Sequence, residues 1–278
     1  MPQLLSAPAR GQRGFALLIV LWMLVLIAFI TAHVTAAGRT EIRIAGNLAA
    51  NAAAQAAADG AIYQAIFNLA DPRPERHWAL DRAPHDIDIG GSRVTLRLED
   101  EDARVNPSYA SPALVAALLQ VVGSDPGSAA SLANGIAEWV GSASSRRPAA
   151  AVLAEYQAAG LDYGPPGAPL ESLDELLRVR GMTPTLFAAL RPHLTLFGQP
   201  VPDRAGADAE IAAALALLGP PAPGVRAALP TASDVITARI HATAQGPANA
   251  IATRVAVARI GPSQPNGYTL LAWENAED

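Results

Sequence analysis

The sequence predicts an α+β protein in which a long N-terminal helix packs on an antiparallel sheet and a large all-helical insertion interrupts that sheet. Three observations carry this prediction. An apolar run from Phe15 continues into a helix-forming stretch with no proline before Pro72. Residues 86–98 and 235–273 alternate apolar and polar side chains with a period of two, which is typical of strands. The residues between them show helical periodicity instead.

The apolar run, residues 15–37, has the length and composition of a membrane-spanning helix. It contains no Asp, Glu, Lys or Arg, and about 20 apolar residues in a helix cross a hydrocarbon core roughly 30 Å thick. Arg10 and Arg13 precede the run. The positive-inside rule therefore places the N-terminus in the cytoplasm and the rest of the chain outside it.

A secretory signal peptide is the alternative for the same stretch. Its apolar core is usually about 7–15 residues long and ends at a small-residue cleavage site, which Ala32, Thr35, Ala36 and Ala37 would supply. The chain would then be a secreted protein, such as an enzyme, that begins after Ala37. Helix-forming sequence from Phe15 to about Ala70 would measure on the order of 80 Å, and this length favours the anchor.

The second half of this helix carries one apolar stripe, which we expect to lie on the sheet. Its members recur mostly at three- to four-residue steps, as one buried helix face requires. They are Ile42, Ile44, Leu48, Ala52, Ala56, Ile62, Ile66 and Leu69. Prolines at 72 and 74 end the helix, because proline lacks a backbone donor.

The strand-like segments predict a mainly antiparallel sheet. Residues 86–98 form a hairpin that turns at Gly90 and Gly91. Three further strands are predicted at residues 235–242, 252–260 and 268–273. The most charged patch of the chain follows the hairpin and consists of Glu99, Asp100, Glu101 and Asp102. Runs of like charge are usually solvated, so we expect these side chains to be exposed.

The insertion is predicted to be helical throughout. Helices are expected at residues 112–122, 128–140 and 149–159. Ser172 and Glu175 then form a capping box for a further helix, whose apolar side is Leu173, Leu176, Leu177 and Val179. Pro184 opens the next helix. Residues 201–232 are rich in Pro, Gly and Ala and read as a linker around one short helix at about 207–218.

Composition and motifs point away from enzymes and nucleic-acid binding. The formal net charge is −5, and there is no cysteine, no G-x-S-x-G and no H-E-x-x-H. The five histidines lack metal-ligand spacing, and His33 reads as a side chain at the membrane interface. We therefore expect no catalytic residue, no metal site and no attraction for nucleic acid.

The sequence Arg13-Gly14-Phe15, followed by an apolar run and a long amphipathic helix, resembles the start of a type IV pilin-like protein, a pseudopilin. The resemblance implies that a prepilin peptidase cuts between Gly14 and Phe15. Residues 1–14 would then be a leader peptide, and Phe15 would become the N-methylated mature terminus. Most pilins carry Glu as the fifth mature residue, where this chain has Ile19. Among the pseudopilins, the minor pseudopilins of the general secretion pathway protein K family lack this Glu.

Two internal strings strengthen the resemblance to the protein K family. Residues 99–106 with residues 134–139, EDEDARVN and NGIAEW, are similar to the family's EDE-x-(G/A)-(K/R)-(I/F/L)-N…I-x-D-W pattern. Residues 172–195 are similar to its S-x-x-E-L-x-x-V-x-G pattern and the helix after it. The likeness breaks after Trp139, where the family usually continues with acidic residues and this chain reads VGSAS.

The resemblance implies a division of the chain and a function. The expected parts are the transmembrane half of the helix (15–37), a pseudopilin α/β domain (38–101 and 233–278), a helical insertion domain (102–200) and the linker (201–232), to which no role is assigned. The implied function is that of a non-enzymatic subunit at the tip of the periplasmic pseudopilus. It would sit in the bacterial inner membrane with a periplasmic C-terminal domain, and prime pseudopilus assembly for protein export across the outer membrane. Implied partners are minor pseudopilins of the I and J types, the major pseudopilin, the prepilin peptidase and inner-membrane lipid.

Two further points concern ligands. The family's insertion domain binds calcium, which takes six to eight oxygen ligands, but near the expected loop this chain offers only Glu138, Glu155 and Asp162. We therefore expect a lost or weakened calcium site.

The alternative function is a membrane-anchored helix-hairpin-helix protein for DNA binding or uptake, built on residues 172–193. Pro184 would remove one of the amides that such a module uses to grip phosphate.

Overall fold

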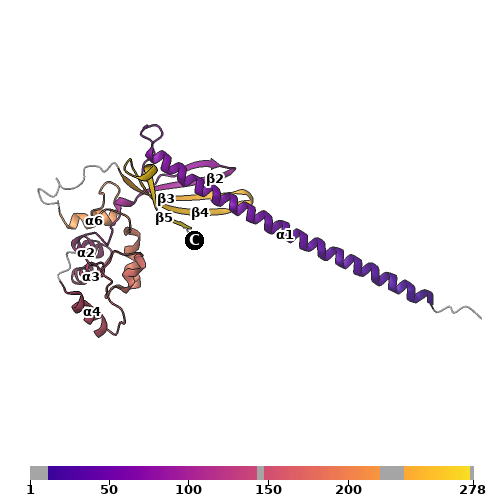
Figure 1. Cartoon of the computed structure of the whole chain (residues 1–278), viewed down its shortest axis with the longest axis horizontal. Coiled ribbons are helices and arrows are strands. Elements are labelled where there is room, and N and C mark those ends of the chain that lie inside the picture. Colours follow the sequence, from indigo (N-terminus) through magenta and orange to yellow (C-terminus); the bar gives the residue numbers. More distant parts are fainter. Residues whose placement is uncertain (1–11, 143–146, 220–234, 276–278) are drawn as a thin grey trace, which may run out of the picture.

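The longest element of the molecule is a single helix, α1 (Gln12–Ala70), of 59 residues. The computed structural model describes residues 12–142, 147–219 and 235–275. Figure 1 shows α1 as a rod whose C-terminal part lies on the sheet while its N-terminal part projects away from the rest of the chain. The predicted uninterrupted helix to Ala70 is confirmed. Residues 1–11 of the expected leader and 220–234 of the expected linker lie outside the described residues.

The sheet has five antiparallel strands in chain order. They are β1 (His85–Ile89), β2 (Ser92–Asp100), β3 (Ile236–Gln245), β4 (Ile251–Ile260) and β5 (Tyr268–Asn275), with short 3-10 turns at Pro247–Asn249 and Pro265–Gly267. Gly90 and Gly91 connect β1 to β2 with φ of 58° and 80°, the left-handed conformation that glycine adopts without a Cβ clash. The predicted hairpin and the α+β class are confirmed.

The contact between α1 and the sheet is made largely of alanine. The buried helix residues are Ala50, Ala54, Ala57, Ala58, Ala61, Ile62, Ala65, Ile66 and Leu69, and the sheet adds Val94, Leu96, Leu98, Ala238, Ile240, Ala242, Ala244, Ala256, Ala258 and Ile260. At Gly246 an added Cβ would lie 3.0 Å from the Ala54 Cβ. The β3–β4 turn therefore lies so close to the helix that a side chain at this position would push the two apart by a few tenths of an ångström.

The predicted apolar stripe of α1 is wrong for five of its eight members. Its last three members, Ile62, Ile66 and Leu69, are buried on the sheet as expected. Ile42 and Ile44 are exposed because they precede the part of the helix that the sheet covers. The other three are also exposed because they face away from the sheet: Leu48, Ala52 and Ala56.

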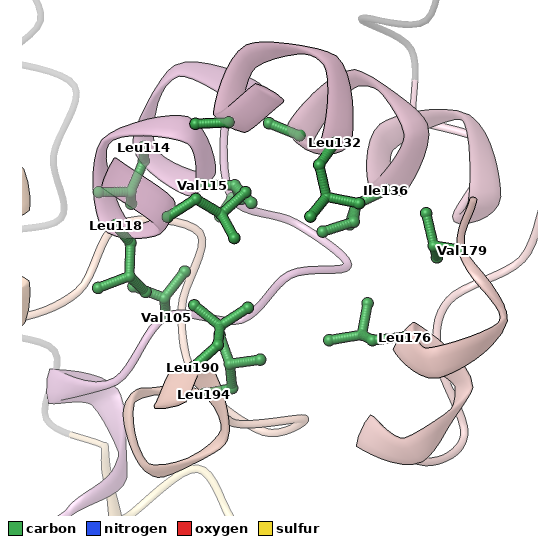
Figure 2. Packing of buried hydrophobic residues seen from close by; sticks show 14 of the residues in the cluster. Val105, Leu114, Val115, Leu118, Leu132, Ile136, Leu176, Val179, Leu190 and Leu194 are labelled. Atoms are coloured by element: carbon green, nitrogen blue, oxygen red, sulfur yellow. The ribbon is translucent and has the colours of Figure 1, made fainter. Parts of the chain in front are cut away.

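A helical region is inserted between β2 and β3. Its α-helices are α2 (Pro112–Val121), α3 (Pro126–Trp139), α4 (Ala149–Ala158), α5 (Pro184–Leu190) and α6 (Ala209–Leu217), and its 3-10 helices are η1 (Glu101–Ala103), η2 (Leu173–Arg178) and η3 (Arg191–His193). Figure 2 shows side chains from α2, α3, η2 and α5 converging on one core, among them Leu118, Ile136, Leu176 and Leu190. This core is separate from the one under α1.

Two expectations for this region need correction. The helix capped by Ser172 and Glu175 has its predicted capping box but is a 3-10 helix rather than an α-helix. With three residues per turn, Leu176 and Val179 share the buried side, whereas Leu177 is 42% exposed. The short helix expected within the linker is α6, and Ile211, Ala214 and Leu215 bury it in the helical core, so this part of 201–232 is packed structure.

Candidate functional site

Within the described residues, one helix is long and apolar enough to cross a membrane, namely the Phe15–Thr35 part of α1. The side chains along this part are exposed. The hydroxyls of Thr31 and Thr35 each donate to a backbone carbonyl four residues earlier, at 2.8 Å. They are thereby satisfied inside the helix without water. This part of α1 fits a single-pass membrane anchor.

The residues predicted for processing lie at the projecting end of α1. Gly14 and Phe15 are consecutive in its helical backbone, and Ile19 follows one turn later. Phe15 and Ile19 are both exposed. Cleavage and methylation stay predictions, and the folded head leaves Phe15 uncovered.

The face of α1 that points away from the sheet exposes large apolar side chains between polar ones such as Asn51, Gln55 and Gln64. Leu48 is 65% and Phe67 60% exposed. Tyr63, also exposed, lies with its ring centroid 5.8 Å from that of Trp273 on the edge strand β5. Asp59 interrupts the face, and its Oδ1 accepts a 2.8 Å hydrogen bond from Arg254. The face is therefore a candidate contact surface for other helices.

A buried ion pair joins the helical region to the sheet. Glu101, in η1, is fully buried. Arg239 of β3 donates to its two carboxylate oxygens at 2.7 Å and 2.6 Å, and the Thr195 hydroxyl donates to it at 2.6 Å. Such charge-assisted, two-pronged contacts are the strongest hydrogen bonds that side chains make. Glu101 thus connects β3 with the chain segment that returns from the helical region.

The sequence predicts that the acidic run, residues 99–102, is exposed to solvent. The structure corrects this prediction, because Glu101 is buried and paired with Arg239. Burial alone would raise the pKa of Glu101, but the hydrogen bonds and charge of Arg239 outweigh it and hold this pKa below its ordinary value. Burial raises the pKa of Asp100 to about 6, and the charges of Asp102 and Asp203 add to the effect. Burial also raises the pKa of Asp102, whose Oδ2 accepts from the Thr237 amide at 3.2 Å.

The rest of the EDEDARVN string fixes the outgoing and returning segments side by side. Arg104 donates to Glu99 at 2.6 Å. Val105 pairs with Leu194 in a parallel bridge. The buried Asn106 amide donates to the carbonyls of Leu196 and Gly198 at 3.0 Å and 3.1 Å. The string is thus a junction whose partners lie about 90 to 138 positions away.

The loop expected to have lost calcium has its carboxylates engaged by arginines. Arg147 contacts both Glu138 and Glu155, and Arg180 contacts Glu155 at 2.5 Å. These ion pairs leave fewer carboxylate oxygens for a cation, and the weakened calcium site stays a prediction. Arg180 is also the turn residue that a DNA-binding hairpin would direct at phosphate, and here its guanidinium is bound to Glu155.

A cleft of about 500 Å³ opens beside the junction. Arg104, Arg191 and Arg239 line it together with Glu171, Asp174 and Glu274. Its charges nearly balance, which gives it no preference for an anion or a cation. The cleft marks the seam between the helical region and the sheet.

The roles of Arg239 and Thr195 could not be found from sequence patterns alone. Arg239 alternates with Ala238 and Ile240 on a strand, a position that reads as an ordinary outward-facing side chain. One signal was available, because an acidic run next to a strand end invites a search for arginines on the other strands. That search leaves several candidates, since most of the predicted strands contain an arginine.

The comparisons with known proteins agree with this architecture. The family model described as type II secretion system (T2SS), protein K, matches residues 95–199, which contain the junction string and the helices up to η3. No curated protein matches the chain. A solved chain matches with a TM-score of 0.56 and 16% identity over 87% of this chain and 99% of that one. It belongs to the crystal structure of the GspK-GspI-GspJ complex from the enterotoxigenic Escherichia coli type 2 secretion system.

The structural likeness at this identity concerns the fold, and the family model concerns the helical region. Residues 95–199 match the protein K family of the type II secretion system, and the chain has a GspK-like α+β fold.

Proposed function

We propose that the chain is the minor pseudopilin at the tip of the periplasmic pseudopilus, where it primes filament assembly for protein export across the outer membrane. The observation that carries the proposal is α1 itself, one helix that is an apolar anchor over Phe15–Thr35 and the spine of the folded head from Ala50 onward. The anchor sits in the inner membrane, with its N-terminus in the cytoplasm and the head in the periplasm. The role is mechanical and not enzymatic.

The missing carboxylate at Ile19 supports the tip position. A Glu within the membrane is costly and needs a partner, which in a filament would be the amino terminus of the subunit above. Ile19 has no such requirement. The chain can therefore be the subunit that has no neighbour above it.

The placement of the helical region also supports a tip role. In Figure 1 it lies at the end of the head away from the projecting end of α1. The junction at Glu101 fixes it there through buried hydrogen bonds. A bulky group held at that end would obstruct a further subunit stacking above.

The partners we propose are minor pseudopilins of the I and J types, by likeness to the complex, and the major pseudopilin below them. Their helices would pack on the outward face of α1. The chain has no cysteine, so Leu48→Cys gives a single thiol on that face, and Glu75→Cys is a matched exposed control beyond the helix. Crosslinks from position 48 to a cysteine in the helix of a co-expressed I-type partner are expected, with none from position 75. Equal crosslinking from both would contradict the proposed surface.

The processing step is tested by the mass of the mature amino terminus. Cleavage by prepilin peptidase between Gly14 and Phe15 gives a chain that begins with N-methylated Phe15. A chain that begins after Ala37 would instead identify a secreted protein and end the proposal.

A gel shift at low salt tests the DNA-uptake alternative, since protein contacts to phosphate are strongest at low salt. No binding to double-stranded DNA is expected.

A further inference from the structure

Three potential metal ligands meet on the helical region, and no sequence motif predicts that they meet. His193, Asp208 and Glu210 each offer one ligand atom, and these atoms lie within 4.8 Å of one another. The His193 Nδ1 is 2.7 Å from the Asp208 Oδ2. Among the described residues, no other group of three His, Asp or Glu side chains meets this distance condition.

Two of the three ligands are held in place by the backbone around them. The His193 carbonyl accepts from the Val105 amide at 3.0 Å, and Leu194, next in the chain, is buried in the helical core. Asp208 caps α6, because its Oδ1 accepts from the Ile211 amide at 2.8 Å. This cap turns the other oxygen, Oδ2, toward His193. A prearranged pair of ligands lowers the entropy that a bound ion must overcome.

The third ligand, Glu210, completes the set from the solvent side. Glu210 lies in the first turn of α6, exposed, and makes no ion pair with the part of the chain that the structure describes. Its carboxylate adds a second negative charge beside His193. The two carboxylates also offset the partial positive charge at the N-terminus of α6, which by itself would repel a cation.

The mixture of ligands selects the kind of ion. Calcium prefers six to eight oxygens, whereas imidazole nitrogen with carboxylate oxygen suits zinc and related transition-metal ions. Three protein ligands leave a position for water in a tetrahedral zinc site.

We propose that His193, Asp208 and Glu210 bind a divalent transition-metal ion of the zinc class. The ion ties α6 to η3, the 3-10 helix that ends at His193, and so closes the intervening segment of chain. The site lies outside the loop after Trp139, so it does not depend on the fate of the calcium site there. It also does not depend on the role of the chain in secretion.

Zinc titration of the detergent-solubilised full chain tests the site. We expect one zinc ion per chain by calorimetry, a rise of several degrees in the melting temperature, and absorption bands of ordered cobalt when Co²⁺ replaces zinc. Glu210→Gln alters an exposed side chain and so leaves the fold intact. It should weaken zinc binding at least about tenfold, because even the loss of a group that only supports a metal ligand costs about 10–100-fold in affinity. His193→Gln should abolish the effect.

Two matched controls keep the test specific. Glu75→Gln and His77→Gln replace an exposed Glu and an exposed His elsewhere, and both should bind zinc like the unchanged chain. Absence of stoichiometric binding by the unchanged chain would overturn the proposal. Unaltered zinc affinity in Glu210→Gln would overturn it as well, even if His193→Gln failed to fold.

Discussion

The two cores of the molecule differ in the size of the side chains that fill them. The core between α1 and the sheet is dominated by alanine, whereas the helical region buries mostly leucine, isoleucine and valine around Trp139. Small side chains let a helix lie close to a sheet, and large ones fill the wider spaces between helices. The first core is therefore sensitive to added volume and the second to lost volume.

The largest effect on stability is expected from breaking the Glu101–Arg239 ion pair, which links the two regions. Glu101→Ala leaves the Arg239 guanidinium largely buried without its partner, and breaking a buried pair in this way costs about 3–5 kcal/mol. We expect the free energy of unfolding in urea to fall by that amount. Glu75→Ala, at an exposed position, should change it by less than about 0.5 kcal/mol. A small effect at Glu101 would mean that the junction does not hold the two regions together.

The second-largest effect on stability is expected from removing side-chain volume in the helical core. Leu176→Ala removes a fully buried side chain and leaves a cavity, at a cost of about 2–5 kcal/mol. Its neighbour Leu177 is 42% exposed, so Leu177→Ala should cost much less. Urea unfolding of the two variants measures the difference. Equal costs would contradict the 3-10 geometry that separates these side chains.

Added volume under α1 should have a smaller effect. Ala58→Leu places extra methyl groups where the helix meets the sheet, and overpacking typically costs about 1–3 kcal/mol. Ala56 lies on the opposite, exposed face of the same helix, so Ala56→Leu should be nearly neutral for the isolated chain. If thermal unfolding shows Ala58→Leu to be neutral too, the close helix–sheet contact is wrong.

The smallest effect is a pH dependence at the junction. The folded protein holds the Asp100 proton more tightly than the unfolded chain, because its pKa is raised from 3.8 to about 6. The resulting stabilisation is present in full below about pH 4 and is lost as the pH rises through about 6.

Asp100→Asn removes the loss of stability at neutral pH, because asparagine carries no charge. Its side-chain oxygen can still accept the hydrogen bond from the Asp102 amide. The variant should be more stable than the unchanged chain by about 1–2 kcal/mol at neutral pH, allowing for the partial exposure of Asp100. The two curves should converge near pH 4. A stability difference that does not vary with pH would show that Asp100 titrates normally.

Much of the fold follows from local patterns, and the exceptions have physical causes. The Gly90–Gly91 hairpin, the capping box at Ser172 and the strands β3 to β5 depend on residues close in sequence, which the pattern contains. The stripe on α1 was misassigned because it followed the large apolar residues, such as Leu48, while the sheet contacts alanines that carry no strong signal. Leu177 was misassigned because an α-helix was assumed where six residues form a 3-10 helix.

The candidate site was harder to predict than the fold. The projecting anchor is visible in the composition of residues 15–37. The burial of Glu101 is not, because it depends on Arg239, which lies 138 positions away, and like charges in a row usually stay in water. Likewise, nothing in the spacing of His193, Asp208 and Glu210 indicates that their side chains meet.

The bare stretch of α1 between the span and the sheet has a mechanical consequence. The apolar span ends at Thr35, and the first helix residue that the sheet covers is Ala50. Fifteen intervening steps of 1.5 Å place the head on a stalk of roughly 22 Å above the lipid. In the proposed assembly, a subunit raised by that distance would leave room at the bilayer surface for the heads of its neighbours beneath it.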